Sequence, residues 1–187
     1  MSMRKLRIIA TALVAAVPLV AAAQVQSHYG FGTPATPQDL AKYFSIPADG
    51  RGLPPGSGTA ANGAKLFADN CAACHGDKLQ GNPTAGLGGD KLIGGRGTLA
   101  TDAPVKTVES YWPYATTLFD YIKRAMPFTS PGTLSDDEVY SLVAYILSEA
   151  KIIKANETMD AKSLPKVAMP NRDGFEPDPR PELGLYR

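Results

Sequence analysis

The stretch Cys71-Ala72-Ala73-Cys74-His75 contains both cysteines of the chain, and a helical pattern leads into it. Thr59 is suited to cap the start of this helix, because its hydroxyl can accept a hydrogen bond from the first turn. Two cysteines that are three residues apart in a helix lie on one face. The motif therefore presents two thiols and an imidazole at the end of a helix. Apolar side chains ahead of it recur every three or four residues, at Ala60, Ala64, Phe67 and Cys71.

The pattern Cys-x-x-Cys-His is the attachment signature of a c-type haem. Each thiol can form a thioether with one haem vinyl group, and His75 can then direct a ring nitrogen at the iron. The alternatives are a disulfide, a redox-active cysteine pair and a zinc site. No Val/Ile-rich strand precedes Cys71, as a thioredoxin-like pair would require, and His28 is the only other histidine. We therefore predict one covalently bound haem c, attached to Cys71 and Cys74, with His75 as an axial ligand of the iron.

A methionine is expected as the sixth ligand of the iron. Met126 follows an amphipathic segment and directly precedes Pro127, where a helix should end, so a rigid loop would carry its thioether. Ligation by histidine and methionine raises the reduction potential of a haem. We therefore predict Met126 as the second axial ligand, with Met169, Met159 and His28 as alternatives. A further alternative is that Met126 only fills the core and that the iron has an open position.

Residues 1–23 have the features of a secretory signal peptide. Three basic side chains, Arg4, Lys5 and Arg7, precede an apolar stretch that ends in the small residues Ala21-Ala22-Ala23. An uncleaved anchor is the alternative, although the stretch is shorter than the roughly 20 residues that span a bilayer. Removal of this segment takes away three basic groups and no acidic group, so the formal net charge changes from +1 to −2. We predict cleavage after Ala23, a periplasmic location, no later membrane span and, because no long basic run remains, no nucleic-acid partner.

The rest of the chain predicts a small all-α fold. The 187 residues, 44% of them hydrophobic and 20% charged, suffice to bury a core. We expect about three to five helices, among them one near Tyr114–Ala125 and one that begins with the Ser135/Glu138 capping box and ends near Glu149. A short helix at 37–44 is a further candidate. The Gly-rich residues 76–110 are expected to form a long loop. A covalent haem would give this loop a surface on which to pack.

Four segments follow from these patterns. They are a signal peptide at 1–23, an irregular N-terminal extension at 24–58, a haem domain at 59–150 and an extended Pro-rich tail at 151–187. The segment Met169–Phe175 combines apolar and charged side chains, so we expect it either to wrap over the domain or to dock onto a partner protein.

The order of these features resembles class I cytochrome c: a helix that ends in Cys-x-x-Cys-His, a loop region, a Met-Pro pair and a final helix. In that family the first and last helices cross at a tight contact. Gly63 and Phe67 on the first helix, with Leu142 and Tyr145 on the last, match the crossing positions. Gly63 would permit close approach of the two backbones, and the two rings would fill the crossing. The resemblance covers residues 59–149 and implies the class I cytochrome c fold around a covalent haem.

A narrower resemblance covers residues 59–176. The runs LIGGRGTL at 92–99, YWPYATTLFDY at 111–121 and MPNRDGF at 169–175 look like the cytochrome c subunits of sulfite and sulfur dehydrogenases, the SoxD type. The single Cys-x-x-Cys-His resembles the single-haem versions. The resemblance implies a non-catalytic subunit that takes electrons from a molybdenum-containing dehydrogenase and passes them to another cytochrome or an oxidase. The alternatives are a general electron shuttle that serves several dehydrogenases and a haem enzyme with an open sixth position.

Three side chains are candidates to bind the haem propionates. Arg96 in the Gly-rich loop could donate hydrogen bonds to a carboxylate, and Trp112 or Tyr114 could do so through its N–H or O–H group. The alternatives are a solvated Arg96 and a Trp112 that only packs. The charges in the segments expected around the haem nearly cancel, so we do not predict a charged ring that steers a partner.

Overall fold

The computed structural model describes residues 32–36, 45–83, 89–177 and 179. The chain divides into two units, Met1–Tyr43 and Phe44–Arg187. In the first unit the described residues 32–36 are exposed and form no helix or strand. The expected signal peptide at 1–23 and the candidate helix at 37–44 lie outside the described residues. Among the residues that are described, no helix combines the length and the apolar character that a membrane crossing requires.

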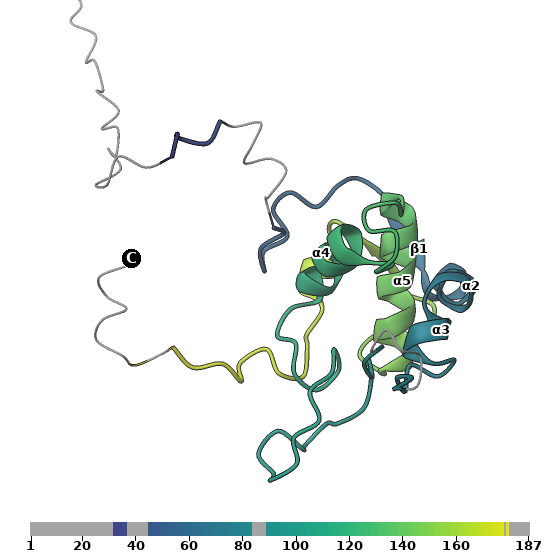
Figure 1. Ribbon diagram of the computed structural model, residues 1–187, viewed down its shortest axis with the longest axis vertical. Coiled ribbons are helices and arrows are strands. Elements are labelled where there is room, and N and C mark those ends of the chain that lie inside the picture. The colour runs from purple at the N-terminus through teal and green to yellow at the C-terminus, as the bar shows by residue number, and fades with distance from the viewer. Residues whose placement is uncertain (1–31, 37–44, 84–88, 178, 180–187) are drawn as a thin grey trace, which may run out of the picture. The chain divides into compact units, whose positions relative to one another are not determined.

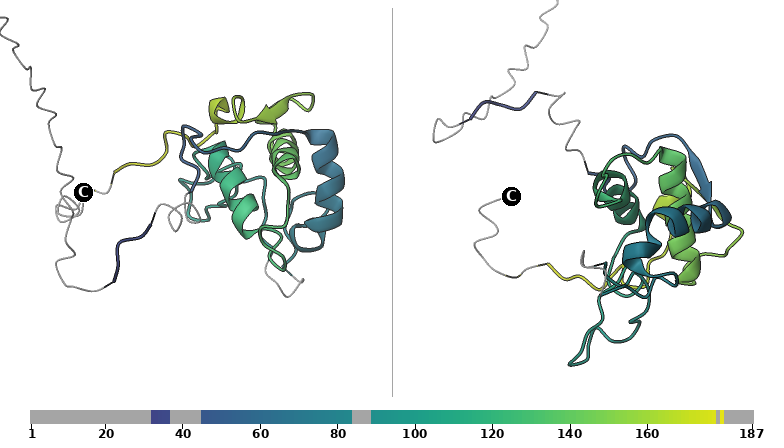
Figure 2. Two further views of the ribbon diagram at one scale, coloured as in Figure 1. Left: turned by 90° about the horizontal axis from the view of Figure 1, so that it is seen from above. Right: turned by 45° about the vertical axis from the view of Figure 1, so that its right-hand side comes forward.

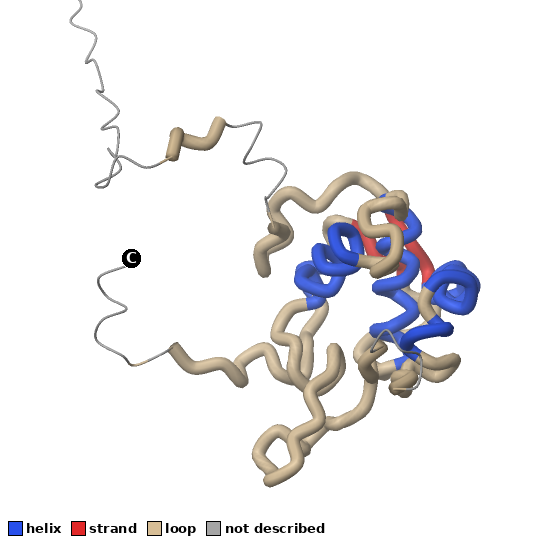
Figure 3. Tube along the Cα trace, viewed as in Figure 1, coloured by secondary structure: helices blue, strands red, loops and turns tan. Residues whose placement is uncertain are grey.

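The second unit is built mainly from four α-helices (Figures 1 and 3). The helices are α2 (Ala60–Asn70), α3 (Ala72–His75), α4 (Ala115–Ala125) and α5 (Asp136–Glu149). Two short strands, β1 (Ser57–Thr59) and β2 (Thr158–Asp160), and a 3-10 helix, η1 (Leu164–Lys166), complete the set. The prediction of a mostly helical fold is confirmed, and α5 lies between α4 and α2 in each view (Figures 1 and 2).

The crossing of α2 and α5 confirms the role expected for Gly63. A Cβ atom at Gly63 would overlap the carbonyl of Ser141 and would lie 2.7 Å from the Cβ of Tyr145. The rings of Phe67 and Tyr145 fill the contact with their centroids 5.3 Å apart. Leu142 is buried beside them. The two backbones therefore approach more closely than any other residue at position 63 would allow.

The predicted helix ends are also confirmed. The Thr59 hydroxyl caps α2 by accepting from the Asn62 N–H, and Ser135 and Glu138 form the capping box of α5. The apolar side chains along one face of α5 are buried, at Val139, Leu142, Val143, Ile146 and Leu147. Burial of one such side chain contributes about 1.5–3 kcal/mol to folding, so α5 is the centre of the core.

The expected extended tail from residue 151 is wrong for residues 158–169. β2 pairs antiparallel with β1, with Met159 opposite Gly58. Met159, Leu164 and Met169 are buried in the same core as α5. The apolar side chains in this segment outweigh its proline content, and Pro165 occurs in the first turn of η1, where a missing N–H costs nothing.

Candidate haem site

The cysteine motif occupies a short helical turn of its own. Cys71 ends α2, with its N–H donating to the Phe67 carbonyl, and its own carbonyl then accepts from the N–H groups of Cys74 and His75 at 3.1 and 2.9 Å. The continuous helix expected through the motif is therefore interrupted at Cys71. Both cysteines are free thiols and half-buried. Burial, with a smaller effect from Cys74, raises the pKa of Cys71 to about 11.

The His75 ring is held by a backbone carbonyl. Its Nδ1 atom lies 2.7 Å from the carbonyl oxygen of Asp90. A carbonyl can only accept a hydrogen bond, so Nδ1 is the donor, and in the neutral ring this leaves the lone pair on Nε2. This tautomer is the one that binds a metal through Nε2, and the bond to Asp90 fixes the orientation of the ring.

The segment after His75 brings Asp90 into place. The Gly81 N–H donates to the His75 carbonyl at 2.7 Å, and the Leu92 N–H donates to the Leu79 carbonyl at 2.9 Å. Leu79 is fully buried. Gly89 lies so close to the Cys74 carbonyl that a Cβ atom would overlap it. Backbone contacts to the motif itself therefore determine where the Asp90 carbonyl lies.

The three methionines considered as ligands differ in their surroundings. Met126 directly follows α4 as its C-cap, as the position of Pro127 predicts, and its side chain is half-buried. Met159 and Met169 are buried in the core of the protein. His28 lies outside the described residues. Met126 is thus the methionine among the three that keeps part of its surface outside the protein core.

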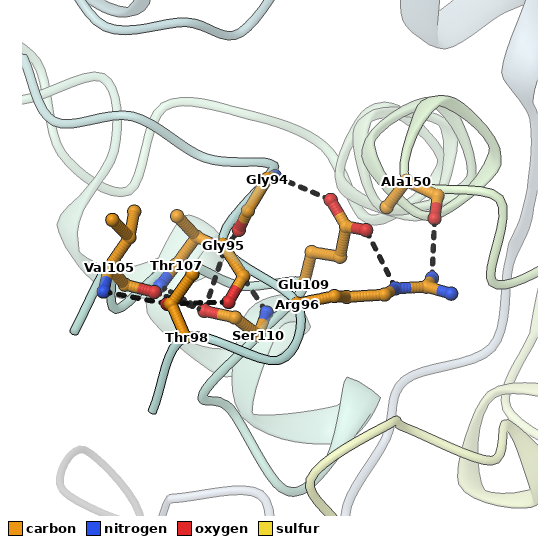
Figure 4. Close-up of polar contacts among 9 residues, drawn as sticks. All are labelled: Gly94, Gly95, Arg96, Thr98, Val105, Thr107, Glu109, Ser110 and Ala150. Carbon is orange, nitrogen blue, oxygen red and sulfur yellow. Dashed lines mark hydrogen bonds and ion pairs between the residues drawn. The ribbon is translucent and has the colours of Figure 1, made fainter. Parts of the chain in front are cut away.

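Arg96 forms contacts that the sequence did not predict (Figure 4). Its Nε atom pairs with Glu109 at 2.7 Å, and one Nη2–H donates to the carbonyl of Ala150, the C-cap of α5, at 2.6 Å. Glu109, whose side chain is 13% exposed, also accepts from the Gly94 N–H at 2.5 Å. The hydrogen bond to Ala150 therefore attaches the Gly-rich loop to the C-terminal end of α5, and the ion pair joins two parts of the loop itself.

Hydroxyl groups close the same loop on itself (Figure 4). Thr107 donates to the Gly94 carbonyl at 2.7 Å, and Ser110 donates to the Val105 carbonyl at 2.6 Å. The Thr98 hydroxyl accepts from the Val105 N–H at 2.9 Å. Side chains thus bind backbone groups that no helix or strand would satisfy.

Trp112 and Tyr114 flank the start of α4. Trp112 packs edge-to-face on Tyr121 with ring centroids 5.7 Å apart. Tyr114 is the N-cap residue of α4, and its side chain makes no capping bond. Within the described residues neither the indole N–H nor the Tyr114 hydroxyl has a hydrogen-bond partner, so both are free to donate. Within the same residues, no three His, Cys, Asp or Glu side chains gather to hold a metal ion.

Comparisons with known proteins agree with this geometry. The cytochrome c family model matches residues 60–150. The structure of the sulfane dehydrogenase SoxCD from Paracoccus pantotrophus has a chain that is 40% identical, with a TM-score of 0.71; the match covers 84% of the present chain and 77% of that chain. This chain belongs to the cytochrome c family. It is a class I cytochrome c that resembles the SoxD-type subunit, and it binds one haem c covalently.

A second solved structure is more distant. The thiosulfate dehydrogenase TsdBA from Marichromatium purpuratum is 25% identical over 48% of this cytochrome and 17% of that chain, with a TM-score of 0.35. The search of curated proteins gave no match.

The described residues of this cytochrome fit a c-type haem. Two free thiols three residues apart and an imidazole with an unprotonated Nε2 are the groups that such a haem requires. Sequence reasoning missed the Asp90 carbonyl, because any residue can supply a backbone acceptor. It also missed Glu109 as the partner of Arg96, since opposite charges 13 residues apart in a loop carry no signal of contact.

Proposed function

We propose that this cytochrome is a periplasmic mono-haem electron carrier of a sulfur-compound dehydrogenase. It would accept single electrons from a molybdenum-containing sulfite or sulfur dehydrogenase subunit and pass them to another cytochrome or an oxidase. The observation that carries the proposal is the extent of the likeness to SoxCD, which covers 84% of the chain, whereas the family model ends at residue 150. A general shuttle would need only the haem domain, so likeness over a longer part of the chain favours a dedicated partner.

In this proposal, Cys71 and Cys74 would form the thioethers, and His75 and Met126 would hold the iron. The haem supplies an iron that cycles between the ferric and ferrous states. The Asp90 carbonyl supports His75, because a hydrogen bond to Nδ1 fixes the ring and raises the basicity of Nε2. Met126 would hold the remaining position of the iron, so the site would transfer electrons without binding a substrate there.

Trp112, Tyr114 and Arg96 are proposed as donors to the haem propionates. Among the described residues, the Trp112 indole N–H and the Tyr114 hydroxyl have no hydrogen-bond partner, which supports this role. Arg96 uses its Nε–H for Glu109 and one Nη2–H for the Ala150 carbonyl. A guanidinium has five N–H donors, so three remain for a carboxylate.

The periplasmic location is proposed from the sequence of residues 1–23 together with the haem. The segment has the basic, apolar and small-residue parts of a signal peptide. Haem attachment to a Cys-x-x-Cys-His motif takes place outside the bacterial cytoplasm, so export and cofactor are consistent. N-terminal sequencing of the protein from a periplasmic extract should begin at Gln24, and an N-terminus at Met1 would contradict the proposal.

The axial ligands can be tested by optical spectroscopy of the purified holoprotein. Ferric haem with a methionine ligand has a weak absorption band at about 695 nm, as expected for sulfur ligation. We expect the band in the wild type and in Met169→Leu, and its loss in Met126→Ala. A high-spin ferric spectrum of the wild type would instead favour the enzyme with an open position.

The partner can be tested with purified components. A molybdenum sulfite dehydrogenase supplied with sulfite should reduce this cytochrome, and the two proteins should elute together from a size-exclusion column. Reduction without co-elution would favour the general shuttle. Absence of reduction by sulfite- or sulfur-oxidising dehydrogenases would contradict the proposal.

A further inference from the structure

The segment Met169–Phe175 packs against Tyr111. Met169 anchors its start, because only 4% of this residue is exposed. The Asn171 Nδ2–H group donates to the Tyr111 carbonyl at 2.7 Å. The Phe175 ring then packs edge-on against the Tyr111 ring, with centroids 5.2 Å apart. The Lys106 ammonium lies over the same ring at 5.2 Å, so Tyr111 is held by side chains from two segments.

A turn gives Asn171 and Phe175 their positions. The Gly174 N–H donates to the Asn171 carbonyl at 3.1 Å, and the Arg172 N–H donates to the Met169 carbonyl at 3.2 Å. A Cβ atom at Gly174 would overlap the amide of Asn171. Glycine at 174 therefore leaves room for the Asn171 amide. The turn places that amide and the Phe175 ring against the same residue, Tyr111.

The acceptor of the Asn171 bond is the carbonyl of the peptide that joins Tyr111 to Trp112. Because a peptide group is planar, fixing this carbonyl also fixes the N–H and the chain direction of Trp112. The Trp112 ring packs on Tyr121 of α4, and Met126 directly follows α4 as its C-cap. Contacts of the C-terminal segment thus extend through Tyr111 and Trp112 to the helix that carries the proposed axial ligand.

We propose that Asn171 and Phe175 are positioning residues for the haem site, acting through Trp112. The proposal rests on the function proposed above, in which the Trp112 N–H donates to a haem propionate. Loss of either contact would loosen the Trp112 backbone and weaken that hydrogen bond. A propionate charge that is less well neutralised favours the ferric form of the iron, so the reduction potential would fall.

The test is a redox titration of the full-length holoprotein. Asn171→Ala and Phe175→Ala keep the net charge unchanged. Asn156→Ala is a matched control, because the Asn156 side chain is exposed and makes no hydrogen bond to any of the described residues. At the midpoint potential of the wild type, we expect the ferric to ferrous ratio to rise about threefold in each variant. A change of this size is what the weakening of one hydrogen bond would produce. The control should keep a ratio of one. Variants that unfold more readily in urea at an unchanged ratio would show a structural role alone and would overturn the proposal.

A double-mutant cycle tests whether the effect passes through Trp112. Trp112→Phe should itself raise the ferric to ferrous ratio, and Asn171→Ala should then add nothing in that background. Equal effects of Asn171→Ala with Trp112 and with Phe at 112 would overturn the proposal. If Trp112→Phe leaves the ratio unchanged, the propionate contact fails as well. If only Trp112→Phe shifts the ratio, the propionate contact stands and the positioning role fails.

Discussion

The crossing of α2 and α5 and the loop at residues 94–110 hold distant segments together in different ways. At the crossing, Gly63 lets two helices meet and Phe67 packs on Tyr145, so apolar surface removed from water supplies the stability. In the loop, Arg96, Glu109 and a set of hydroxyl groups bind backbone atoms. The net contribution of each hydrogen bond to stability is only about 1 kcal/mol, although a buried polar group that is left without a partner costs more. We therefore expect the crossing to determine whether the domain folds, and the loop contacts to determine only the local shape of residues 94–110.

Residues 158–169 resemble the crossing in being held by buried apolar side chains, and their removal should have the largest effect. A chain that ends at Glu157 loses the buried Met159, Leu164 and Met169. Truncation of one such side chain costs about 2–5 kcal/mol, so the loss of three should leave the domain unfolded. A chain that ends at Pro170 keeps all three and should fold. Circular dichroism and haem incorporation would report both results, and a folded short form would contradict the assignment of residues 158–169 to the core.

Replacement of Gly63 by valine tests the close contact between α2 and α5. The new side chain would overlap the Ser141 carbonyl, so the two helices must move apart. We expect a loss of about 3 kcal/mol or more in the free energy of unfolding, measured by urea denaturation. Ala61→Val, at an exposed position of the same helix, should cost less than about 1 kcal/mol. Equal effects at the two positions would mean that the close approach of the helices does not matter.

Glu109→Gln tests the polar contacts that hold the loop at residues 94–110. The neutral amide keeps the shape of the side chain but loses the ion pair with Arg96. We expect a cost of about 2 kcal/mol, because the pair is partly buried and the bonds to the carboxylate are charge-assisted. Asp102→Asn, which changes an exposed carboxylate in the same loop, should be neutral within about 0.5 kcal/mol. A neutral Glu109→Gln would show that the loop holds its shape without the ion pair.

The capping box of α5 should show a smaller effect that depends on pH. Ser135→Ala should cost about 1 kcal/mol at pH 7. Hydrogen bonds from the Ser135 N–H and hydroxyl hold the pKa of Glu138 below its usual value of 4.5. The contribution of Glu138 is therefore present above pH 4.5 and is lost as the pH falls through the lower pKa of the folded state. Urea titrations at pH 7 and pH 3 would measure the free energy of unfolding of wild type and Ser135→Ala. The difference between the two proteins should be smaller at pH 3, and an equal difference at both pH values would contradict this account.

Much of the helical framework could be predicted, because its signals are local. Thr59, Ser135 and Pro127 mark helix ends by chemistry that acts within one turn. Gly63 and Tyr145 could be assigned to the crossing by resemblance to a known family. The Cys-x-x-Cys-His motif identified its own cofactor, because few other sites require those residues at that spacing.

The remaining features depend on contacts between distant segments. The strands β1 and β2 have three residues each, too few to show an alternating pattern. The bond from His75 uses a backbone carbonyl, and the partner of Arg96 is one of several acidic residues in the loop. Buried Met159 and Leu164 lie among polar residues and prolines, whose frequency indicated an extended chain. A count of apolar side chains spaced along residues 159–169 would have been the better indicator of packing.

The bond from Arg96 to the Ala150 carbonyl has a consequence for motion. That carbonyl belongs to the last turn of α5, where no further helical N–H is present to bind it, so it becomes a defined acceptor only after α5 has formed. The loop therefore docks after the helix and can detach without unfolding it. Amide hydrogens of Gly94, Val105 and Thr107, which donate to side chains of the loop, should exchange with solvent through this partial opening. Those in the middle of α5 should exchange only when the whole domain unfolds. Amide exchange in the loop should therefore be faster than amide exchange in α5.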